Sequence, residues 1–389
     1  MAMQPWQDPS IEKIRKAHIE FASEYLEGDY GRRDKEGEFS MDRWRKAAEF
    51  GALSYGMPVE YGGRSVPVTH LLAAYEGLGY GCHDTGFLYA MLSQLCGTQM
   101  TINALGSEEL KAKYLPGLVS GQSLAAYCST EEEMGSDVFS MVTLATPTDD
   151  GFLLNGHKRY LTNSPNSDLA LVFAKTSNSR NPMDLVALLV EMRWDGASHG
   201  KTFEKAGFRT TPMGELFFDG VRVPNGNAIG GKGGGLRSLL ESAAWERSIL
   251  LANALGPMAR TIDECVKRSK TRMQYGKPIG SHQQISSKIA DMIARYRISR
   301  QLVYDIASRL GNGGSLQRHL QDVSICKLYV TESYVQNQLA AVQIFGVRGI
   351  LMDYPYQQDL RDSIGSTIWA GTSESLRNTI AKMSGVPVE

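Results

Sequence analysis

The chain has 389 residues, of which 42% are hydrophobic and 21% charged, so it carries enough apolar material for sizeable cores and is not globally disordered. Lys and Arg number 41 and Asp and Glu 42, and this balance argues against a generic nucleic-acid binder, whose affinity comes from neutralising phosphates. No apolar run approaches the ~18 residues that span a bilayer, and Met1 to Ser10 lack the apolar core of a secretory signal. At roughly 150 residues per domain the length predicts two or three domains.

Cysteine and histidine are both scattered along the chain. The five cysteines form no C-x-x-C pair, and an odd count in a long chain does not indicate a disulfide framework. The seven histidines form no cluster with carboxylates, so no metal site is expected. These observations favour a reducing, cytoplasmic setting.

The first third of the chain has the periodicity of helices. Apolar side chains recur every three or four residues, which is typical of one face of an amphipathic helix. We expect an N-terminal helical domain over residues 1–123. Its helices are expected at residues 11–25, 41–50, 66–76 and 88–105, the second closed by Gly51.

From about Ala125 the pattern changes to short strands separated by turn residues. Helices that could form crossovers between parallel strands are missing, so we expect an antiparallel barrel or sandwich. This middle β domain is expected over residues 124–230. Its strands are expected near residues 142–147, 152–154, 169–173, 185–190 and 216–223.

A glycine cluster at residues 230–235 marks the second boundary. It nearly forms a phosphate-binding loop, but Gly233 follows Lys232 where Ser or Thr is required, so we interpret it as a flexible linker. Long apolar stripes over residues 285–310 and 328–345 then predict an antiparallel helical bundle over residues 231–389. The fold class is therefore α+β and mainly α, in the order helical, β, helical.

One carboxylate falls on an apolar stripe. Leu239, Ala243, Glu246, Leu250 and Ala254 follow one another at helical spacings. A carboxylate on a buried stripe costs several kcal/mol unless it is paired or protonated. Glu246 is therefore either a buried partner of Arg247 or another cation, or a general base whose pKa is raised by an apolar cleft.

Three motifs lie far apart in the chain. They are YCSTEEEMGSD at 127–137, RMQYGKPIGSHQ at 272–283, and QIFG at 343–346 followed by RDS at 361–363 and IWAGT at 368–372. Together they resemble the motifs of one family, the acyl-CoA dehydrogenases. Their order and spacing match over essentially the whole chain, as does the helical, β, helical layout. The resemblance implies the fold of that family, with an N-terminal helical domain, a middle antiparallel β domain and a C-terminal four-helix bundle.

The resemblance implies FAD, held between the β domain and the bundle of a homotetramer, and no metal. Ser136 would also approach the substrate pantetheine, and Arg247 would bind substrate. The implied cofactor residues are Tyr127, Ser129, Thr130, Gly135, Ser136, Tyr160, Thr162, Thr372 and Glu374, together with Arg272, Tyr275, Gln283, Gln343 and Gly346, which would hold the adenosine and phosphates of a neighbouring subunit's FAD.

Two departures from the family pattern are informative. Most members have the catalytic Glu immediately before Gly-Thr, where this chain has Ala370. A minority that includes isovaleryl-CoA dehydrogenase carries the base on an earlier helix, in a sequence that resembles Trp245-Glu246-Arg247, so Glu246 is the expected catalytic base. Glu132 replaces the proline that usually follows Thr-Glu and puts the local loop geometry in question.

The chain looks most similar to the subgroup that oxidises L-proline held as a thioester on a carrier protein in natural-product biosynthesis. We therefore expect L-prolyl-S-carrier protein to become the dehydroprolyl (pyrroline-carboxyl) thioester. The partner would be an acyl or peptidyl carrier protein, met by a basic rim at Lys201, Lys205 and Arg209. Alternatives are a short- or branched-chain acyl-CoA dehydrogenase, a non-catalytic flavin-binding scaffold and a flavin monooxygenase.

Overall fold

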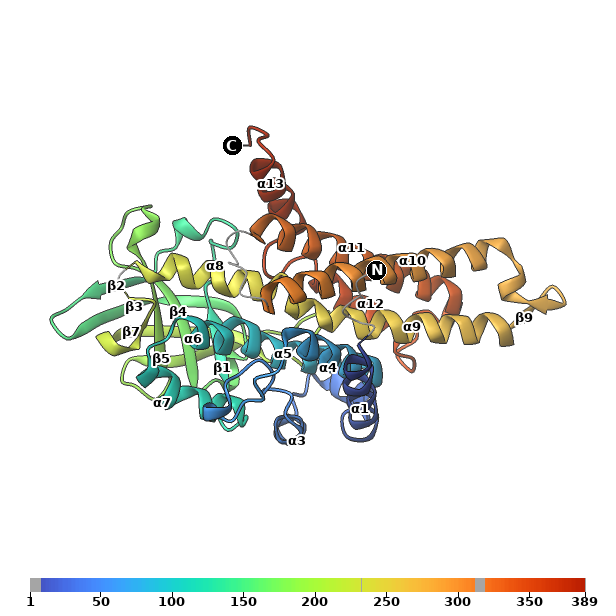
Figure 1. The fold of residues 1–389 in the computed structure, drawn as a ribbon, viewed down its shortest axis with the longest axis horizontal. Coiled ribbons are helices and arrows are strands. Elements are labelled where there is room, and N and C mark those ends of the chain that lie inside the picture. Colours follow the sequence, from blue (N-terminus) through green and yellow to red (C-terminus); the bar gives the residue numbers. More distant parts are fainter. Residues whose placement is uncertain (1–7, 232, 312–318, 389) are drawn as a thin grey trace.

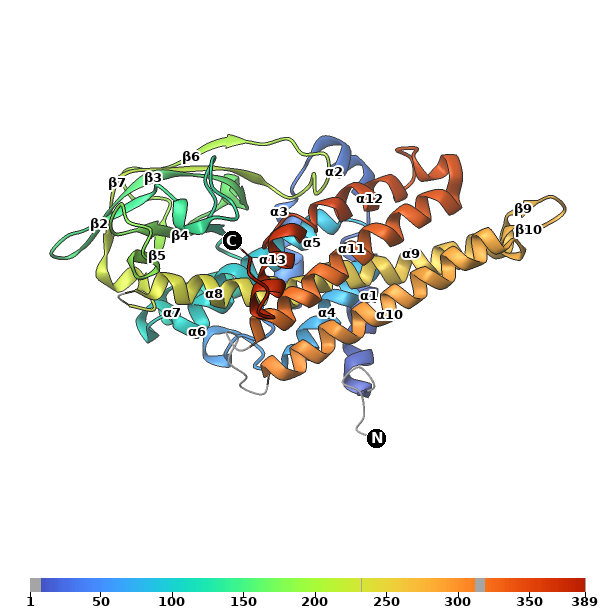
Figure 2. The same cartoon turned by 90° about the horizontal axis from the view of Figure 1, so that it is seen from above.

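A computed structural model describes residues 8–231, 233–311 and 319–388; Lys232 of the incomplete phosphate-loop pattern lies outside this part. Figures 1 and 2 show a β domain at one end of an elongated molecule, helices α1 to α7 along one side, and a long helical bundle reaching the other end. The expected order of helical, β and helical parts is confirmed. Within the described residues no helix is long and apolar enough to cross a membrane.

Four of the seven N-terminal helices begin at a side chain that caps them: Asp8, Ser40, Asp84 and Ser107. Ser40 accepts a hydrogen bond from the N–H of Arg43, and Gly51 ends the same helix in the left-handed region, at φ 99°. The helix expected at 88–105 starts earlier and is interrupted by a π-helical segment, Gln94–Gln99. The helices are α1 (Pro9–Tyr25), α2 (Tyr30–Glu36), α3 (Met41–Phe50), α4 (Val68–Gly81), α5 (Thr85–Ser93), α6 (Met100–Leu105) and α7 (Glu108–Val119).

The β domain is a sheet with the order β6-β7-β3-β2-β4-β5-β8, and β1 pairs with β4. The expected antiparallel pairing is found between β2 and β3, β3 and β7, β4 and β5, β5 and β8, and β6 and β7. Two pairings depart from it: β1 runs parallel to β4, and β2 meets β4 in parallel at one position. The strand expected near 152–154 is longer than predicted: β3 continues to Thr162 and passes a register shift between Leu154 and Gly156. The strands are β1 (Ala125–Cys128), β2 (Leu144–Pro147), β3 (Gly151–Thr162), β4 (Leu169–Lys175), β5 (Leu185–Glu191), β6 (Ala197–Thr202), β7 (Met213–Pro224) and β8 (Ala228–Ile229).

The C-terminal part contains the long helices that the stripes predicted. α10 and α11 pack against each other and against α9. A short hairpin, β9 with β10, lies at the far tip of the bundle (Figure 2). The elements are α8 (Gly234–Glu246), α9 (Ala252–Thr271), β9 (Met273–Gln274), β10 (Lys277–Pro278), α10 (Gln283–Gly311), α11 (Leu320–Phe345), α12 (Tyr356–Gly365) and α13 (Ser373–Met383).

The glycine cluster is more than a linker, which corrects the interpretation from sequence. A Cβ on Gly235 would lie 2.4 Å from the carbonyl carbon of Leu185 and 2.5 Å from the backbone nitrogen of Val186. Only glycine allows the first turn of α8 to press this closely on β5. The cluster therefore fixes the direction in which α8 leaves the sheet, and α8 carries the predicted base.

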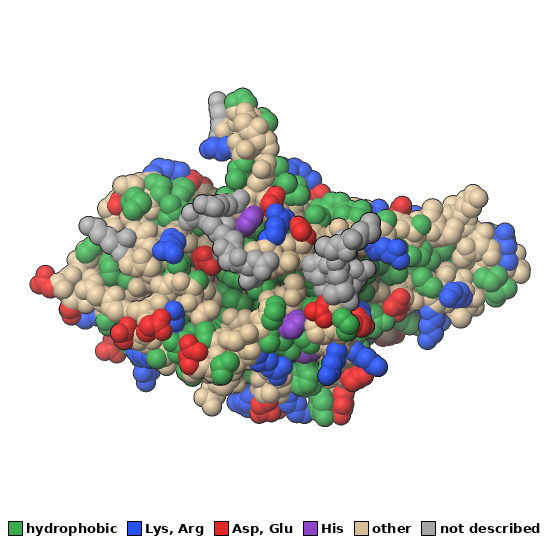
Figure 3. All heavy atoms as spheres, in the orientation of Figure 1, with side chains coloured by type: hydrophobic (Ala, Val, Ile, Leu, Met, Phe, Trp, Pro, Cys, Tyr) green, Lys and Arg blue, Asp and Glu red, His purple; other side chains and the backbone are tan. Residues whose placement is uncertain are grey.

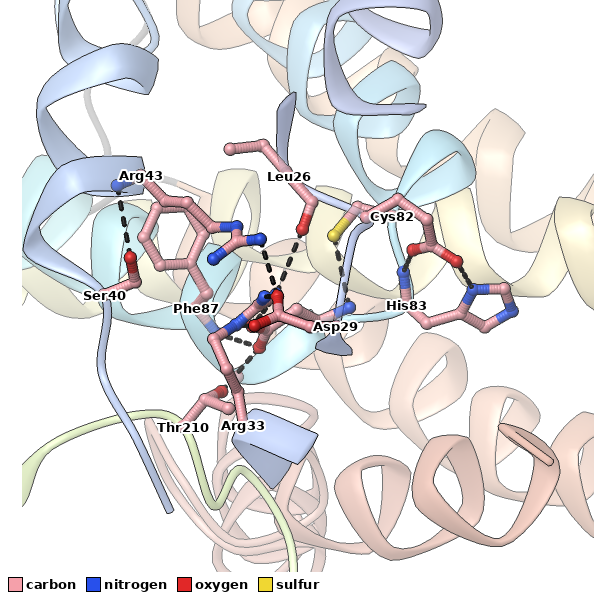
Figure 4. A network of polar contacts seen from close by, with 12 residues as sticks. Leu26, Asp29, Arg33, Ser40, Arg43, Cys82, His83, Phe87 and Thr210 are labelled. Atoms are coloured by element: carbon pink, nitrogen blue, oxygen red, sulfur yellow. Dashed lines mark hydrogen bonds and ion pairs between the residues drawn. The ribbon is translucent and has the colours of Figure 1, made fainter. Parts of the chain in front are cut away.

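A buried polar network joins the helical and β parts (Figure 4). The guanidinium of Arg33 donates to Asp84 Oδ2 at 2.9 Å and to the carbonyl of Leu26 at 3.0 Å. Asp84 Oδ1 accepts from the hydroxyl of Thr210 at 2.5 Å and from the N–H of Phe87 at 3.0 Å. The network ties the start of α5 to the loop between β6 and β7, and both segments reach the candidate site described next.

Candidate active site

Glu246 is the last residue of α8, and the continuous helical stripe predicted through it is wrong. The helix breaks at Ser248, whose hydroxyl donates to the carbonyl of Ala244 at 2.6 Å, and a 3₁₀ turn leads into α9. Helix-breaking by a serine that bonds back to its own helix leaves no Gly or Pro signal in the sequence. The break places the Glu246 carboxylate at a helix end rather than inside a stripe.

The environment of Glu246 favours its neutral form. Burial raises the pKa of Glu246 to about 7, and the charge of Arg247 opposes this increase only in part. The Glu246 side chain is half-buried, so it is not closed off from solvent or from a ligand. A carboxylate with a pKa near neutrality is a stronger base than an ordinary glutamate and remains substantially ionised at pH 7.

The turn before α13 meets the end of α8. Arg247 Nε donates to the carbonyl of Ala370 at 2.9 Å, so the residue that follows Glu246 contacts the turn at position 370. Lys327 Nζ, from α11, donates to the carbonyl of Gly371 at 2.7 Å and lies 5.2 Å from the ring centroid of Trp369. Burial lowers the pKa of Lys327 to about 7, and Arg247 adds to this effect. The turn is held by two cations and carries no carboxylate.

Aromatic and hydroxyl side chains surround Glu246. The hydroxyls of Tyr127 and Ser242 are 2.7 Å apart, and Ser242 lies one turn before Glu246 on α8. The ring of Tyr89 stacks on Phe208, with centroids 4.8 Å apart. Burial and then the charge of Glu246 raise the pKa values of both Tyr89 and Tyr127.

The first motif forms a loop that is stabilised by a buried ion pair between Glu131 and Lys158. Glu131 Oε1 lies 2.8 Å from Lys158 Nζ, and both side chains are buried. Glu131 also accepts the N–H groups of Val142 and Thr143, at 2.7 and 3.0 Å. Lys158 donates to the carbonyl of Ser129 at 3.2 Å. The Glu131–Lys158 pair was missed from the sequence, although Glu131 stands in the first motif.

Other residues of the first motif face outward. Glu132 is exposed and pairs with Arg159, so the residue that replaces the family proline does not enter the core. The N–H of Arg159 donates to the carbonyl of Thr130 at 3.0 Å. Gly135 and Ser136 are exposed, and a Cβ added to Gly135 would meet no atom within 4 Å. This part of the loop is open to a ligand.

Several features near the site fit a bound flavin nucleotide. Tyr160 is 46% exposed and adopts φ 61°, a strained conformation for a bulky residue, and Thr162 follows on the same strand. The indole N–H of Trp369 and the hydroxyl of Ser373 are buried and find no hydrogen-bond partner among the described residues. Thr372 caps α13 by accepting the N–H of Ser375 at 3.2 Å; Glu374 is exposed in the first turn of that helix.

The remaining predicted cofactor residues form a second group at the tip of the bundle. Arg272, Tyr275 and Gly346 line a hollow of about 570 Å³. Gln283 and Gln343 are exposed and lie next in sequence to residues that line it. The tip lies far along the long axis from α8 (Figure 2), so a single chain does not bring the two groups together.

Most of the predicted basic rim makes contacts within the chain and is not exposed to a partner protein. Arg209 donates to the carbonyls of Asp34 at 2.7 Å and Lys35 at 3.0 Å, at the end of α2. Burial lowers the pKa of Lys205 to about 8. Lys201 alone of the three expected residues is an exposed lysine.

Comparison with known proteins assigns the family. Residues 8–122, 126–221 and 233–385 match the N-terminal, middle and C-terminal domains of acyl-CoA dehydrogenases. The chain therefore belongs to the acyl-CoA dehydrogenase family and is an oxidoreductase of that family's fold.

Individual relatives refine this assignment. The chain is 33% identical to the L-prolyl-[peptidyl-carrier protein] dehydrogenase of Pseudomonas fluorescens, over 88% of this chain and 90% of that protein. It is similar to the crystal structure of the prolyl acyl carrier protein oxidase AnaB, with a TM-score of 0.94 and 34% identity over 97% of this chain and 100% of the other. It is also similar to PigA with FAD and proline, with a TM-score of 0.93 and 30% identity over 97% and 98% of the two chains.

Proposed function

We propose that this protein holds FAD and oxidises an L-prolyl group bound as a thioester to a carrier protein, with Glu246 as the catalytic base. The observation that carries the proposal is the hydrogen bond from Arg247, the residue after Glu246, to the carbonyl of Ala370, which joins the end of α8 to the turn where this chain has a methyl group in place of a carboxylate. Burial raises the pKa of Glu246 to about 7. The names of the relatives support the prolyl thioester as substrate.

In the proposed reaction, Glu246 and Arg247 have different roles. The carboxylate of Glu246 takes the proton from the carbon next to the thioester carbonyl. Bound FAD would supply the two-electron acceptor for the hydride of the neighbouring ring carbon, so that the substrate would lose two electrons and gain a double bond. Arg247 is fixed through Nε by the Ala370 carbonyl, and its other N–H groups make no hydrogen bond to the described residues. Those N–H groups are available to the thioester oxygen as negative charge develops on it.

The two groups of cofactor residues support a shared site. We infer that the hollow at the bundle tip holds the adenosine end of a flavin whose ring lies in a neighbouring subunit, in a homotetramer. The apolar side chain of Val347, which lines the hollow and is 67% exposed, supports a covered surface there. Figure 3 shows further hydrophobic side chains on the projecting C-terminal segment, where Met383 is 46% exposed.

Anaerobic mixing with a prolyl-loaded carrier protein tests the proposal. The flavin absorbance should bleach in proportion to loaded carrier, and the tethered arm should lose the mass of two hydrogens. If branched acyl-CoA bleaches the flavin and the prolyl carrier does not, the protein is a branched-chain acyl-CoA dehydrogenase. If neither substrate bleaches the flavin, the protein acts as a non-catalytic flavin-binding scaffold and not as an enzyme on these thioesters.

A further inference from the structure

The hollow at the bundle tip contains two arginines that the family resemblance does not assign. Three arginines line it: Arg268 in the last turn of α9, Arg272 directly after that helix, and Arg348 in the 3₁₀ turn that follows α11. Only Arg272 belongs to a family motif, the one at 272–283. Among the described residues that line the hollow there is no aspartate or glutamate.

The three guanidinium groups have no anionic partner within the described part of the chain. Arg268, Arg272 and Arg348 make no ion pair or side-chain hydrogen bond with another described residue, and the buried Nε of Arg268 has no hydrogen-bond partner there. Burial lowers the pKa of Arg268, and the charges of Arg348 and Arg272 add to this effect. The positive charges are therefore close enough to repel one another, which an anion between them would relieve.

Aromatic rings hold two of these guanidinium groups in position. Cζ of Arg268 lies 5.8 Å from the ring centroid of Phe345, which stacks on Tyr356 with centroids 3.7 Å apart. Cζ of Arg348 lies 5.4 Å from the ring centroid of Tyr354. A guanidinium over a ring face leaves its N–H groups free for an anion, so these side chains are preorganised without being neutralised.

Stabilisation of helix ends accounts for only part of this arrangement. A cation near a helix C-terminus is favourable, and Arg268 lies at such an end. The hollow also includes the start of α10, where His282 and Gln284 line it and the first turn has no acidic residue. A helix start attracts anions and not cations. Arginines that converge beside a helix start therefore match an external anion.

We propose that Arg268 and Arg348 act with Arg272 as a clamp for the diphosphate of the FAD whose ring lies in the neighbouring subunit. The diphosphate is doubly charged, and planar guanidinium groups bind phosphate oxygens through paired N–H groups. The hollow, at about 570 Å³, has the size of a small-molecule site. The inference rests on the proposed function and deepens it, because it names the residues that select the dinucleotide over a flavin without a diphosphate.

Titration of the deflavinated protein with FAD or riboflavin tests the clamp, with quenching of flavin fluorescence as the measurement. Riboflavin has the same ring but lacks the diphosphate and the adenosine. Arg268→Met and Arg348→Met keep an apolar stem and remove the charge. Each variant should bind FAD about 10- to 100-fold more weakly, the effect of losing a charge-assisted hydrogen bond. Its riboflavin affinity should change by less than about threefold, and its FAD affinity should depend less steeply on salt.

Lys270→Met is the matched control, because Lys270 is an exposed cation in the last turn of α9 that does not line the hollow. Its FAD affinity should stay within about twofold of wild type, since an exposed charge is screened by salt. Arg268→Lys keeps the charge without the planar fork and should bind FAD more tightly than Arg268→Met does. ADP should displace FAD from the wild-type protein better than adenosine does, and this difference should shrink in both methionine variants.

Unchanged FAD affinity in both methionine variants, or equal losses for FAD and riboflavin, would overturn the clamp. Equal displacement of FAD by ADP and by adenosine from the wild-type protein would also overturn it. In each of these cases the proposed function stands if a prolyl-loaded carrier still bleaches the bound flavin. A wild-type protein that takes up neither flavin would overturn the proposed function and this inference with it.

Discussion

Replacing Glu246 by Gln keeps the shape of the side chain and removes the basic oxygen. Most family members are expected to carry the catalytic glutamate at the position of Ala370. Because this position is alanine, the described residues offer no second carboxylate at that turn. We therefore expect the rate of flavin reduction to fall by at least the ~10²–10⁴-fold typical of losing a general base. Substrate should still bind, and its binding should still perturb the flavin spectrum.

The pKa of Glu246 sets the pH dependence of the wild-type protein. Only the ionised carboxylate accepts a proton, and its pKa is raised to about 7 by burial. The rate constant for flavin reduction at limiting substrate should therefore rise about tenfold per pH unit below 7 and level off above it. At about pH 5 roughly 1% of the carboxylate is ionised, which predicts a rate about 100-fold below the plateau.

Stopped-flow reduction measured across this pH range, under anaerobic conditions, checks both expectations. Glu241→Gln is a control on the same helix: burial raises the pKa of Glu241 too, but its carboxylate accepts from the indole N–H of Trp245 at 3.0 Å. That variant should keep the inflection near pH 7. The reasoning is refuted if Glu246→Gln reduces its flavin at the wild-type rate, or if Glu241→Gln abolishes the inflection.

The remaining predictions concern the groups that support the site. Lys327→Met should lower kcat more than it raises KM, because the turn at 370–371 loses its bond from Nζ; steady-state kinetics check this. Lys158→Met should destabilise the fold by about 3–5 kcal/mol, since Glu131 is left as an unpaired buried charge, and adding Glu131→Gln should recover part of the loss in thermal melts. Glu246→Gln should raise the Tm at about pH 8 and leave it unchanged near pH 4, because a raised folded-state pKa costs stability only once the carboxylate ionises.

The sequence predicted correctly those helices whose ends are determined by residues within the segment itself. α3 matches its expected range because Ser40 and Gly51 supply both caps within the segment itself. The parallel pairing of β1 with β4 could not be predicted in this way, since its partners at Ala125 and Leu169 are distant in sequence and joined by no crossover helix. The break after Glu246 depends on a serine side chain that is equally compatible with a continuous helix.

In the candidate site, too, the residues with a local sequence signal were predicted and those that depend on distant contacts were missed. Glu246 was predicted because a carboxylate on an apolar stripe is conspicuous, although the stripe itself is broken. Lys327 was missed because its partner is a backbone carbonyl, which no residue pattern reveals. Tyr89 was missed because α5 is buried on all sides, and a tyrosine in such a helix reads as core.

The cations around Ala370 give a physical reason to expect the proposed base on α8 rather than at position 370. A carboxylate at position 370 would stand beside Arg247 and Lys327, which bind the carbonyls of this same turn. Opposite charges within hydrogen-bonding range lower the pKa of a carboxyl group and make it a weaker base. At the end of α8 only Arg247 opposes the effect of burial, and the pKa of Glu246 stays raised. Alanine at 370 leaves both cations free to fix the turn, although Ala370 there adopts φ 53°, which is unfavourable for a residue with a side chain. In the proposed mechanism this turn holds Arg247 in position for the thioester oxygen.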